Sequence, residues 1–368
     1  MTHAFTWSAF PSRVVFAAGA LERIPDEVAR LGRRRVLLIG SGASTDGALS
    51  RLRAALGTRC AAEVPKAAQH VPSDLADAAV RVGREAVADV VVTVGGGSAT
   101  GLGKAVAQAC DVPLVAVPTT YSGSEMTPIW GRTTGGRKQT WSDVRVLPRT
   151  VVYDPELCIG MPPRLAAATG MNALAHCLEA LWSSGANPIT GALAREGGQR
   201  LTDGLPRVVE DPSDVVAHAD NLIGACLAGA ALAQAGTGIH HRTCHVLGGG
   251  WNLPHAETHA VLLPHTTALV GERLPEAMDG PRRLLGSDDP PVALFTLLHR
   301  LRLPQSLAML GMPEDALAEA ARRVFEASRD DPLVHDEGAV RRMLDGAFAG
   351  REPQPLIGSG PARGPRRG

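Results

Sequence analysis

The first half of the chain alternates short apolar runs with amphipathic stretches. The stretches 48–56 and 72–87 have helical spacing and lie between runs of apolar and β-branched residues. Almost wholly apolar runs are typical of strands that are buried on both faces of a parallel sheet. Alternating strands and helices therefore predict a Rossmann-like α/β domain, with helices on both sides of its sheet. The predicted strands are 35–39 (RVLLI), 90–94 (VVVTV), 113–117 (PLVAV) and 150–153.

The second half has a different pattern. From about Pro162 onward the β signal fades, and Ala, Leu and Arg recur with helical spacing, which predicts an all-helical domain. The turn-rich segment YDPELCIGMPP marks the change. We therefore expect a dinucleotide-binding domain over 1–158 and a helical catalytic and substrate domain over 159–357, with the active site in the cleft between them. The Gly, Pro and Arg of 358–368 predict a disordered tail.

Composition narrows the range of partners. Lys plus Arg and Asp plus Glu both number 37, so no bulk field attracts nucleic acid or an anionic membrane. Six cysteines with no CxxC pair favour reduced thiols. The first ten residues lack the features of a signal peptide, and the longest apolar run, 222–235, is too short to span a bilayer. We expect a cytoplasmic protein that acts on a small molecule.

A glycine motif follows the second predicted strand. Gly95, Gly96, Gly97 and Ser98 come directly before a helix that could start near Thr100. Glycines let backbone N–H groups approach phosphate oxygens, and a helix N-terminus adds a favourable dipole. The motif predicts a cradle for the diphosphate of a cofactor. The alternative is an ordinary tight turn between a strand and a helix.

Two further loops belong to the same edge of the predicted sheet. Gly40 and Ser41 follow the first strand with no carboxylate beside them to select for an adenosine ribose, which leaves both NADH and NADPH open. Thr119, Thr120 and Ser124 offer hydroxyls after the third strand, on the side where open α/β sheets bind ligands. The alternative for this second loop is a hydrogen-bonded turn.

Half of the 12 histidines lie between Gly238 and His265. Histidine donates, accepts and ligates near neutral pH, so this concentration indicates chemistry. Asn172 and His176 are four residues apart and should share one face of a helix, and His241 and His245 repeat that spacing. We expect His255 on a loop after GGGWNLP. The other histidines of the window are expected to support the structure: His240, His259 and His265.

Together these motifs resemble the iron-containing alcohol dehydrogenase superfamily. The resemblance extends from about Phe5 to Pro355 and is strongest to the maleylacetate reductases. It implies a nicotinamide cofactor in the cleft, held by the glycine and hydroxyl loops with Lys138 and Met161 as further candidates, and commonly a homodimer. It is carried by GGGSATGLGKA, PTTYSGSEMTPIWG, DPELCIGMPPRLAAATGMNALAHCLEAL and HHRTCHVLGGGWNLPHAETHAVLLPH.

The resemblance also bears on metal binding. In metal-dependent members an Asp and three histidines hold Fe²⁺ or Zn²⁺, and those positions fall on Asn172, His176, His241 and His255. A neutral amide is a much weaker ligand than a carboxylate. We therefore expect no metal; if one is bound, the three histidines are its ligands.

The implied reaction is the NAD(P)H-dependent reduction of maleylacetate to 3-oxoadipate. Hydride addition to the conjugated double bond leaves negative charge on the ketone oxygen, which imidazole N–H groups can stabilise without a metal. We expect His245 or His241 to protonate the carbon next to the ketone, His176 and His255 to orient the ketone, and Asn172 to donate a hydrogen bond.

A dicarboxylate substrate also requires cationic partners. Lys104 and Arg242 are the candidates, although Arg242 could equally brace its own helix. Two other functions remain open. One is a metal-dependent alcohol dehydrogenase, and the other is a cyclising lyase related to dehydroquinate synthase, which uses NAD⁺ transiently.

Overall fold

The computed structural model describes residues 5–7, 9–10, 12–135, 137–331, 333–334, 336–354 and 356, without the side chains of 137 and 138. The predicted tail at 358–368 falls outside these residues.

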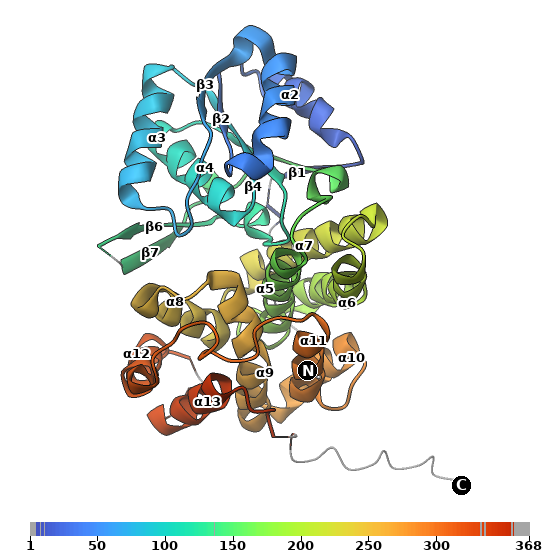
Figure 1. Cartoon of the computed structure of the whole chain (residues 1–368), viewed down its shortest axis with the longest axis vertical. Helices are drawn as coiled ribbons and strands as arrows, with labels where there is room; N and C mark the ends of the chain where they lie inside the picture. The colour runs from blue at the N-terminus through green and yellow to red at the C-terminus, as the bar shows by residue number, and fades with distance from the viewer. Residues whose placement is uncertain are drawn as a thin grey trace.

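A six-stranded parallel sheet forms the first half of the protein (Figure 1). Its strands lie in the order β1-β8-β5-β4-β2-β3, and the central ones are buried on both faces. The predicted fold class is confirmed, and each predicted strand begins and ends within one residue of an observed one. The strands are β1 (Arg13–Phe16), β2 (Val36–Ile39), β3 (Cys60–Val64), β4 (Val90–Gly95), β5 (Leu114–Pro118) and β8 (Thr150–Tyr153).

Helices cover both faces of this sheet. On one face α1 (Ile24–Arg30) and α2 (Asp46–Leu56) pack their buried Ile, Val and Leu side chains against the strands. On the other face α3 (Ser73–Glu85) and α4 (Gly97–Cys110) do the same with Ala, Val and Leu. Apolar burial on both sides explains why the central strands read as continuous apolar runs.

Several strands were missed in the sequence because they are not buried on both faces. Strands β1 and β3 are the two edges of the sheet, and their residues are largely exposed or half-buried. Strands β6 (Ile129–Thr134) and β7 (Arg137–Ser142) form a separate antiparallel hairpin, which projects to one side of the sheet (Figure 1). A run of apolar residues marks a central strand only.

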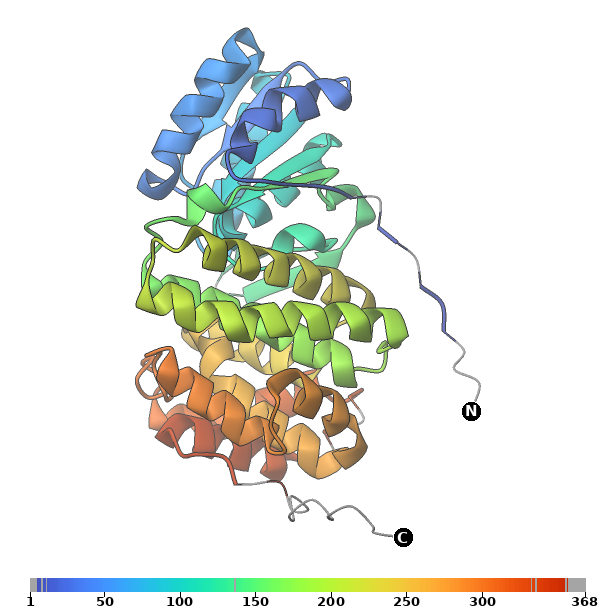
Figure 2. The same cartoon turned by 90° about the vertical axis from the view of Figure 1, so that its right-hand side faces the viewer.

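The second half consists of helices stacked below the sheet (Figures 1 and 2). Its central helix is α5, which packs against α6, α7 and α9 and is buried along almost its whole length. The helices are α5 (Pro163–Trp182), α6 (Pro188–Glu210), α7 (Val215–Ala235), α8 (Ile239–Trp251), α9 (His255–Arg273), α10 (Asp279–Leu285), α11 (Pro290–Arg300), α12 (Leu317–Ala327) and α13 (Glu337–Ala349).

The longest apolar run lies in helix α7. By length and composition α7 could cross a membrane, and it is the one such helix among the described residues. However, 56% of its most apolar window is buried inside the protein. A core helix of this kind passes the same test, and α7 packs in the helical core as the sequence predicts.

The two halves meet at the carboxyl ends of the strands. The direction of strand order reverses between β2 and β4, so their following loops diverge and leave a crevice, the usual ligand site of such sheets. The loop after β5 rests on helix α7, where a Cβ on Gly229 would lie 2.2 Å from the carbonyl oxygen of Gly123. Only glycines permit this approach, which holds the helices against the crevice.

Candidate active site between the two halves

The cofactor candidates of the sheet come together at this crevice. Gly95 has φ 147°, and a Cβ on it would lie 2.0 Å from Ser41 Oγ. A Cβ on Gly96 would lie 2.9 Å from Thr120 Oγ1. The backbone amide of Thr119 donates to the Gly95 carbonyl at 3.1 Å. The loops after β2, β4 and β5 therefore touch one another, and side chains larger than hydrogen would separate them.

The structure also supplies donors for an anion here. Helix α4 begins at Gly97, earlier than the predicted start near Thr100, so the first-turn amides of Gly97 and Ser98 point into the crevice. The hydroxyls of Ser41 and Thr120 are buried and have no protein partner. A glycine cradle, a helix N-terminus and two unpartnered hydroxyls fit the phosphates of a dinucleotide.

Lys104 is not available to a substrate, and that prediction is wrong. It is fully buried, and its Nζ donates to the carbonyls of Ser124, Thr127 and Ile129 at 2.7 to 2.8 Å. Burial lowers its pKa to about 7, with Glu125 opposing the shift. Lys104 thus braces the segment from Ser124 to β6.

Two other cofactor candidates, Lys138 and Met161, lie outside the glycine and hydroxyl loops. Lys138 is on β7, paired with Thr133, and its side chain is outside the described part of the chain. Met161 is packed in the helical core. Neither the loop motifs nor their spacing gives Lys138 or Met161 a role at the cofactor site.

The predicted polar residues of the helical half converge. Helix α5 carries Asn172 and His176, and α8 carries His241 and His245. His255 is the first residue of α9 and not a loop residue as predicted, because Pro254 ends the preceding turn at the helix N-cap. The ring centroids of His176 and His241 are 4.8 Å apart, and those of His245 and His255 are 6.0 Å apart and stacked.

Glu179 orients this cluster and was missed in the sequence. Its side chain is fully buried; Oε1 accepts the backbone N–H groups of Gly238, His240 and His241, and Oε2 accepts Nδ1–H of His241. Burial alone would raise the pKa of Glu179, but His241 and its other partners hold it below the ordinary value. The carboxylate turns His241 Nε2 away from itself and can stabilise a proton there. Its position three residues after His176 was the available signal.

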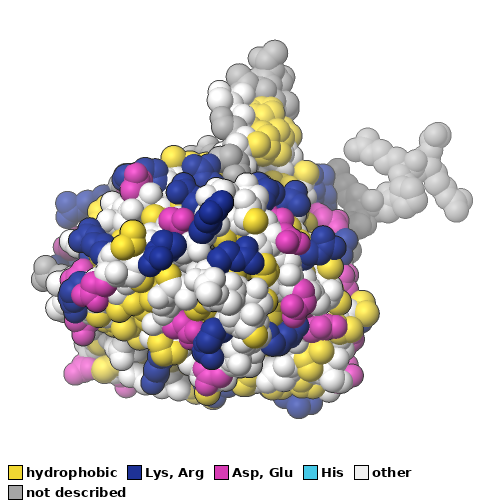
Figure 3. Space-filling view, turned by 90° about the horizontal axis from the view of Figure 1, so that it is seen from above, with side chains coloured by type: hydrophobic (Ala, Val, Ile, Leu, Met, Phe, Trp, Pro, Cys, Tyr) yellow, Lys and Arg dark blue, Asp and Glu magenta, His cyan; other side chains and the backbone are white. Residues whose placement is uncertain are grey.

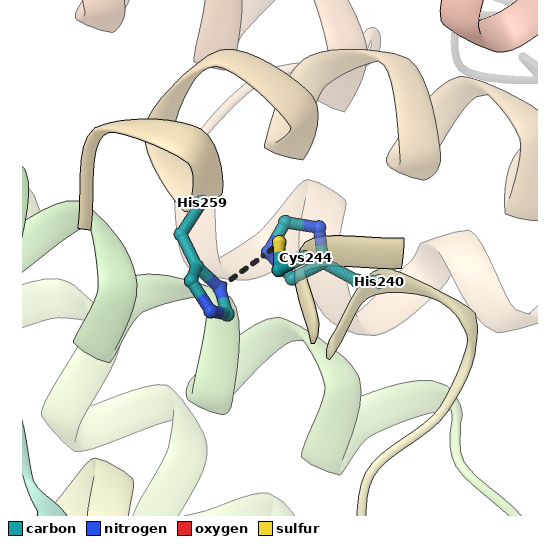
Figure 4. Close-up of side chains that lie close together, drawn as sticks. All are labelled: His240, Cys244 and His259. Carbon is teal, nitrogen blue, oxygen red and sulfur yellow. Dashed lines mark hydrogen bonds between the residues drawn. The ribbon is translucent and has the colours of Figure 1, made fainter. Parts of the chain in front are cut away.

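A second chain of hydrogen bonds fixes His259. The Thr266 hydroxyl donates its hydrogen to the carbonyls of Leu262 and Leu263. Its Oγ1 must therefore accept a hydrogen bond from Nδ1–H of His240, at 2.8 Å. His240 Nε2 then accepts from Nδ1 of His259 at 2.9 Å, the contact drawn in Figure 4. His259 is left with Nε2 as an acceptor in the cluster. Burial lowers the pKa of His240 to about 3, so its ring is neutral.

Four side-chain atoms of the cluster are buried without a partner: Asn172 Oδ1, His176 Nδ1, His241 Nε2 and His259 Nε2. Burial, followed by the charge of neighbouring imidazoles, lowers the pKa of His176 and His259 well below the ordinary histidine value. Unpaired buried polar atoms are costly unless a ligand serves them, so their convergence marks a binding site.

The predicted metal positions His176, His241 and His255 are not among the metal-ligating groups whose atoms lie closest together in the described residues. Within the described residues, the three metal-ligating side chains whose ligand atoms all lie within 4.8 Å of one another are His240, Cys244 and His259 (Figure 4). Two of those atoms already bond each other. Of the positions predicted from the metal-dependent relatives, the first is the neutral amide Asn172, and the carboxylate of Glu179 is turned to His241 Nδ1.

A cavity of about 190 Å³ opens next to the cluster, between the halves. Its wall in the helical half includes His245 and His255, together with Cys244 and Asn252. The first half contributes His70 and Thr133. Of the predicted catalytic residues, His245 and His255 thus face the cavity, while Asn172, His176 and His241 lie behind them. His70, Thr133 and Asn252 are lining residues that the sequence motifs did not single out.

Arg242 does not line the cavity. Its guanidinium pairs with Asp330 at 2.7 Å on the outside of α8, which matches the bracing alternative. Charge elsewhere on the surface is mixed: the end of the molecule formed by the sheet shows Lys and Arg interspersed with Asp, Glu and apolar side chains (Figure 3).

The parallel-sheet crevice fits a dinucleotide and is joined to a buried histidine cluster, an arrangement that suits an oxidoreductase. The family comparison gives its class: residues 11–155 match iron-containing alcohol dehydrogenase, and residues 166–345 match the C-terminal part of the Fe-containing alcohol dehydrogenase family. The chain belongs to the iron-containing alcohol dehydrogenase family.

Individual relatives are similar along nearly the whole chain. A maleylacetate reductase of Burkholderia cepacia is 43% identical over 95% of this chain and 99% of its own length. The crystal structure of maleylacetate reductase from Agrobacterium tumefaciens is 40% identical, with a TM-score of 0.89 over 96% of this chain and 100% of that one. Sulfoacetaldehyde reductase of Bifidobacterium kashiwanohense, solved with NAD⁺, shares the fold at 22% identity, with a TM-score of 0.84 over 94% and 99% of the two chains.

Proposed function

We propose that this protein reduces maleylacetate to 3-oxoadipate with a nicotinamide nucleotide, as a step in the breakdown of aromatic compounds. The similarity to maleylacetate reductases over 95% of the chain supports the substrate. The observation that carries the chemistry is the cavity walled by His245 and His255, directly in front of the buried histidine cluster. Imidazoles at that position can serve an enolate and return a proton to it.

The chain's own groups divide the work. When bound, the reduced nicotinamide supplies hydride to the alkene carbon beta to the ketone. An N–H group of His255 on the cavity wall holds the ketone oxygen as its negative charge grows, and His176 and Asn172 support this from the cluster. Of the two candidate donors, His245 faces the cavity and His241 lies behind it, fixed by Glu179. We assign to His245 the proton that reaches the carbon alpha to the ketone, and to His241 the role of orienting the cluster.

The cofactor is held at the crevice of the sheet. Gly95, Gly96, Gly97 and Ser98 cradle its diphosphate, and the loop carrying Thr119, Thr120 and Ser124 lies toward its nicotinamide half. Gly40 and Ser41 border the adenosine side, and neither of these two residues directly after β2 is a carboxylate. NADH and NADPH are therefore both candidates, and parallel assays decide between them.

The reaction as proposed uses no metal. A neutral amide at Asn172 and a Glu179 that is committed to His241 leave the cluster without an anionic ligand, which weakens its affinity for a divalent cation. Purified protein analysed for metals should contain less than stoichiometric iron and zinc, and chelation should leave the rate unchanged. Stoichiometric metal with loss of activity on chelation would favour the metal-dependent alcohol dehydrogenase instead.

The decisive assay mixes purified protein with maleylacetate and follows the absorbance of NADH and of NADPH in parallel. We expect oxidation of at least one cofactor, in equal amount to the 3-oxoadipate formed. Absence of oxidation with both cofactors would overturn the assignment. Turnover of substrate with no net change of cofactor would indicate a cyclising lyase of the dehydroquinate synthase kind.

We also propose a homodimer. The described residues ahead of β1 extend away from the body (Figure 2), and among them Phe5 and Trp7 are 48% and 36% exposed. Val14 and Phe16 on the edge strand β1 are exposed as well. An exposed apolar edge strand is a usual place for a second chain to pair. Light scattering that gives the mass of a single chain would contradict this proposal.

We also propose a cytoplasmic location, because the cysteines form no disulfides. All six cysteines are unpaired, in agreement with a reducing compartment. The partner that we propose is a small dicarboxylate, and neither nucleic acid nor a membrane is required. Activity recovered from the soluble fraction of lysed cells supports this location, whereas activity confined to the membrane fraction contradicts it.

A further inference from the structure

The proposed substrate carries two carboxylates, yet among the described side chains that line the cavity none is Lys or Arg. Lys104 is buried among backbone carbonyls, and Arg242 is paired with Asp330 outside. The N–H donors left to bind a carboxylate are therefore imidazoles and amides of the cavity wall itself.

His70 is the imidazole that the first half contributes to this wall. It lies edge-to-face with His255 of the helical half on the cavity wall, with ring centroids 6.3 Å apart and planes at 83°. His255 in turn stacks on His245. The three rings thus form a row that starts in the sheet half and ends at the proposed proton donor, so a substrate in the cavity lies between both halves.

The backbone at His70 has an unusual conformation. His70 has φ 63° and Val71 has φ 49°, two successive left-handed residues, of which the second is β-branched. This conformation is rare for residues other than glycine and persists only when the surroundings impose it.

Three contacts impose it here. Thr133 of the β6–β7 hairpin donates to the His70 carbonyl at 2.7 Å through its hydroxyl and to the Val71 carbonyl at 3.0 Å through its backbone amide. The Val71 side chain lies against Gly101 of α4, where a Cβ would be only 2.9 Å from Val71 Cγ2. The loop is therefore clamped between the hairpin and α4, and the clamp aims the His70 ring at the cavity.

From the ring's place in the cavity and the clamp behind it, we propose that His70 binds a carboxylate of the substrate and determines the preference for dicarboxylates. This inference rests on the proposed function for the identity of the substrate. His70 donates an N–H to the carboxylate at the end of the substrate that the sheet half covers, while the helical half serves the ketone. It takes no part in proton transfer.

The test replaces His70 by Asn. Asparagine tolerates the left-handed backbone, so the clamp remains, but its shorter side chain withdraws the donor from the cavity. We expect KM for maleylacetate to rise about tenfold or more, because one charge-assisted hydrogen bond is lost. The value of kcat should stay within about threefold of the wild-type value. The dissociation constants of NADH and NADPH should not change. A matched variant, His299→Asn, alters a histidine of α11 that packs on Phe295 and should leave KM unchanged.

Equilibrium binding separates this inference from the proposed function. Calorimetry with 3-oxoadipate, and with 4-oxopentanoate as its one-carboxylate counterpart, needs no turnover. We expect His70→Asn to weaken 3-oxoadipate about tenfold. If 4-oxopentanoate binds equally to the wild-type and His70→Asn proteins, His70 holds the carboxylate that only 3-oxoadipate carries. If 4-oxopentanoate binds more weakly to the variant, His70 holds the carboxylate that both ligands share.

Two results would overturn the role of His70. One is unchanged KM and unchanged 3-oxoadipate binding in His70→Asn while the wild-type protein reduces maleylacetate. The other is a loss confined to kcat, which would make His70 part of the chemistry and not of binding. A wild-type protein that binds 3-oxoadipate through His70 but fails to reduce maleylacetate would instead refute the proposed function alone.

Discussion

The crevice at the sheet and the histidine cluster in the helices form one active site by different means. The crevice is made of backbone, because Gly95 and Gly96 allow three loops to touch and expose the amides of α4. The cluster is made of side chains, whose directions are set by Glu179 and Thr266 from behind. A site made of backbone is damaged by added atoms, whereas a site made of side chains is damaged by a lost partner.

The largest effect is expected in the cluster, from Glu179→Gln. The amide would present an N–H₂ or a weaker acceptor to Nδ1 of His241, so the ring loses its fixed direction and its support for a proton at Nε2. We expect kcat to fall about 10- to 100-fold with little change in the dissociation constant of the nucleotide.

The matched control for this change is Glu196→Gln, which removes an exposed carboxylate paired with Arg200 on α6. It should leave kcat and thermal stability almost unchanged. Wild-type kcat in Glu179→Gln would show that the cluster does not depend on this carboxylate.

The next effect concerns the crevice, and it tests the opposite vulnerability. In Gly95→Ala the new methyl group meets Ser41 Oγ at φ 147°, so we expect about 2 kcal/mol of lost stability and at least about tenfold weaker nucleotide binding. In Gly97→Ala the methyl group has 3.4 Å to Ser122 Oγ and stabilises α4, so the fold should persist. Titration with NADH measures nucleotide binding, and denaturation curves measure stability. If the Gly95→Ala protein binds NADH with wild-type affinity, the glycines are not part of the cofactor site.

An effect on stability alone, with none on substrate binding, is expected for Lys104→Met. Three backbone carbonyls lose their donor, at a cost of about 1–3 kcal/mol near neutral pH, while KM for maleylacetate stays within about twofold. The pKa of Lys104 is about 7 in the folded protein, below its ordinary value of 10.5 in the unfolded chain, so between these values the unfolded chain binds more protons.

Stability therefore rises with pH in that window. Denaturant unfolding between about pH 7 and about pH 10 should show the advantage of the wild type over Lys104→Met increasing. An advantage that stays flat or decreases would show that the buried amine keeps its ordinary titration, and a raised KM would return Lys104 to the substrate site.

The smallest effect is expected for Arg242→Gln. The residue pairs with a largely exposed Asp330, and exposed pairs contribute about 0–1 kcal/mol. KM and the melting temperature should hardly move. A KM raised about tenfold would mean that Arg242 reaches the substrate and that the sequence-based assignment was right.

Much of the fold could be predicted from the chain alone because its signals are local. Continuous apolar runs located the four central strands, and Ala- and Leu-rich spacing indicated the helical half. The edge strands β1 and β3 and the β6–β7 hairpin carry no such signal, since they are exposed or polar on one side. The division into domains at residue 158 stays a prediction.

The candidate site divides in the same way. Motifs placed Gly95, His241 and His245 in the right neighbourhood, because each belongs to a short pattern. His70 belongs to no pattern of its own, and the one signal for Glu179 is its position three residues after His176, so long-range contacts decide that both reach the site. Lys104 failed as a substrate ligand because the sequence records its charge but not the three carbonyls around it.

By itself the sequence determined the kinds of chemistry present: glycines able to cradle a phosphate, and imidazoles spaced to share a helix face with an amide where relatives have a carboxylate. The tertiary structure alone decided which of these groups face a ligand. That choice depends on burial and on partners far away in the chain, and it turned Lys104 inward, Arg242 outward and His70 into the cavity. Residue type sets what a group can do, whereas its surroundings in the fold decide whether a substrate can meet it.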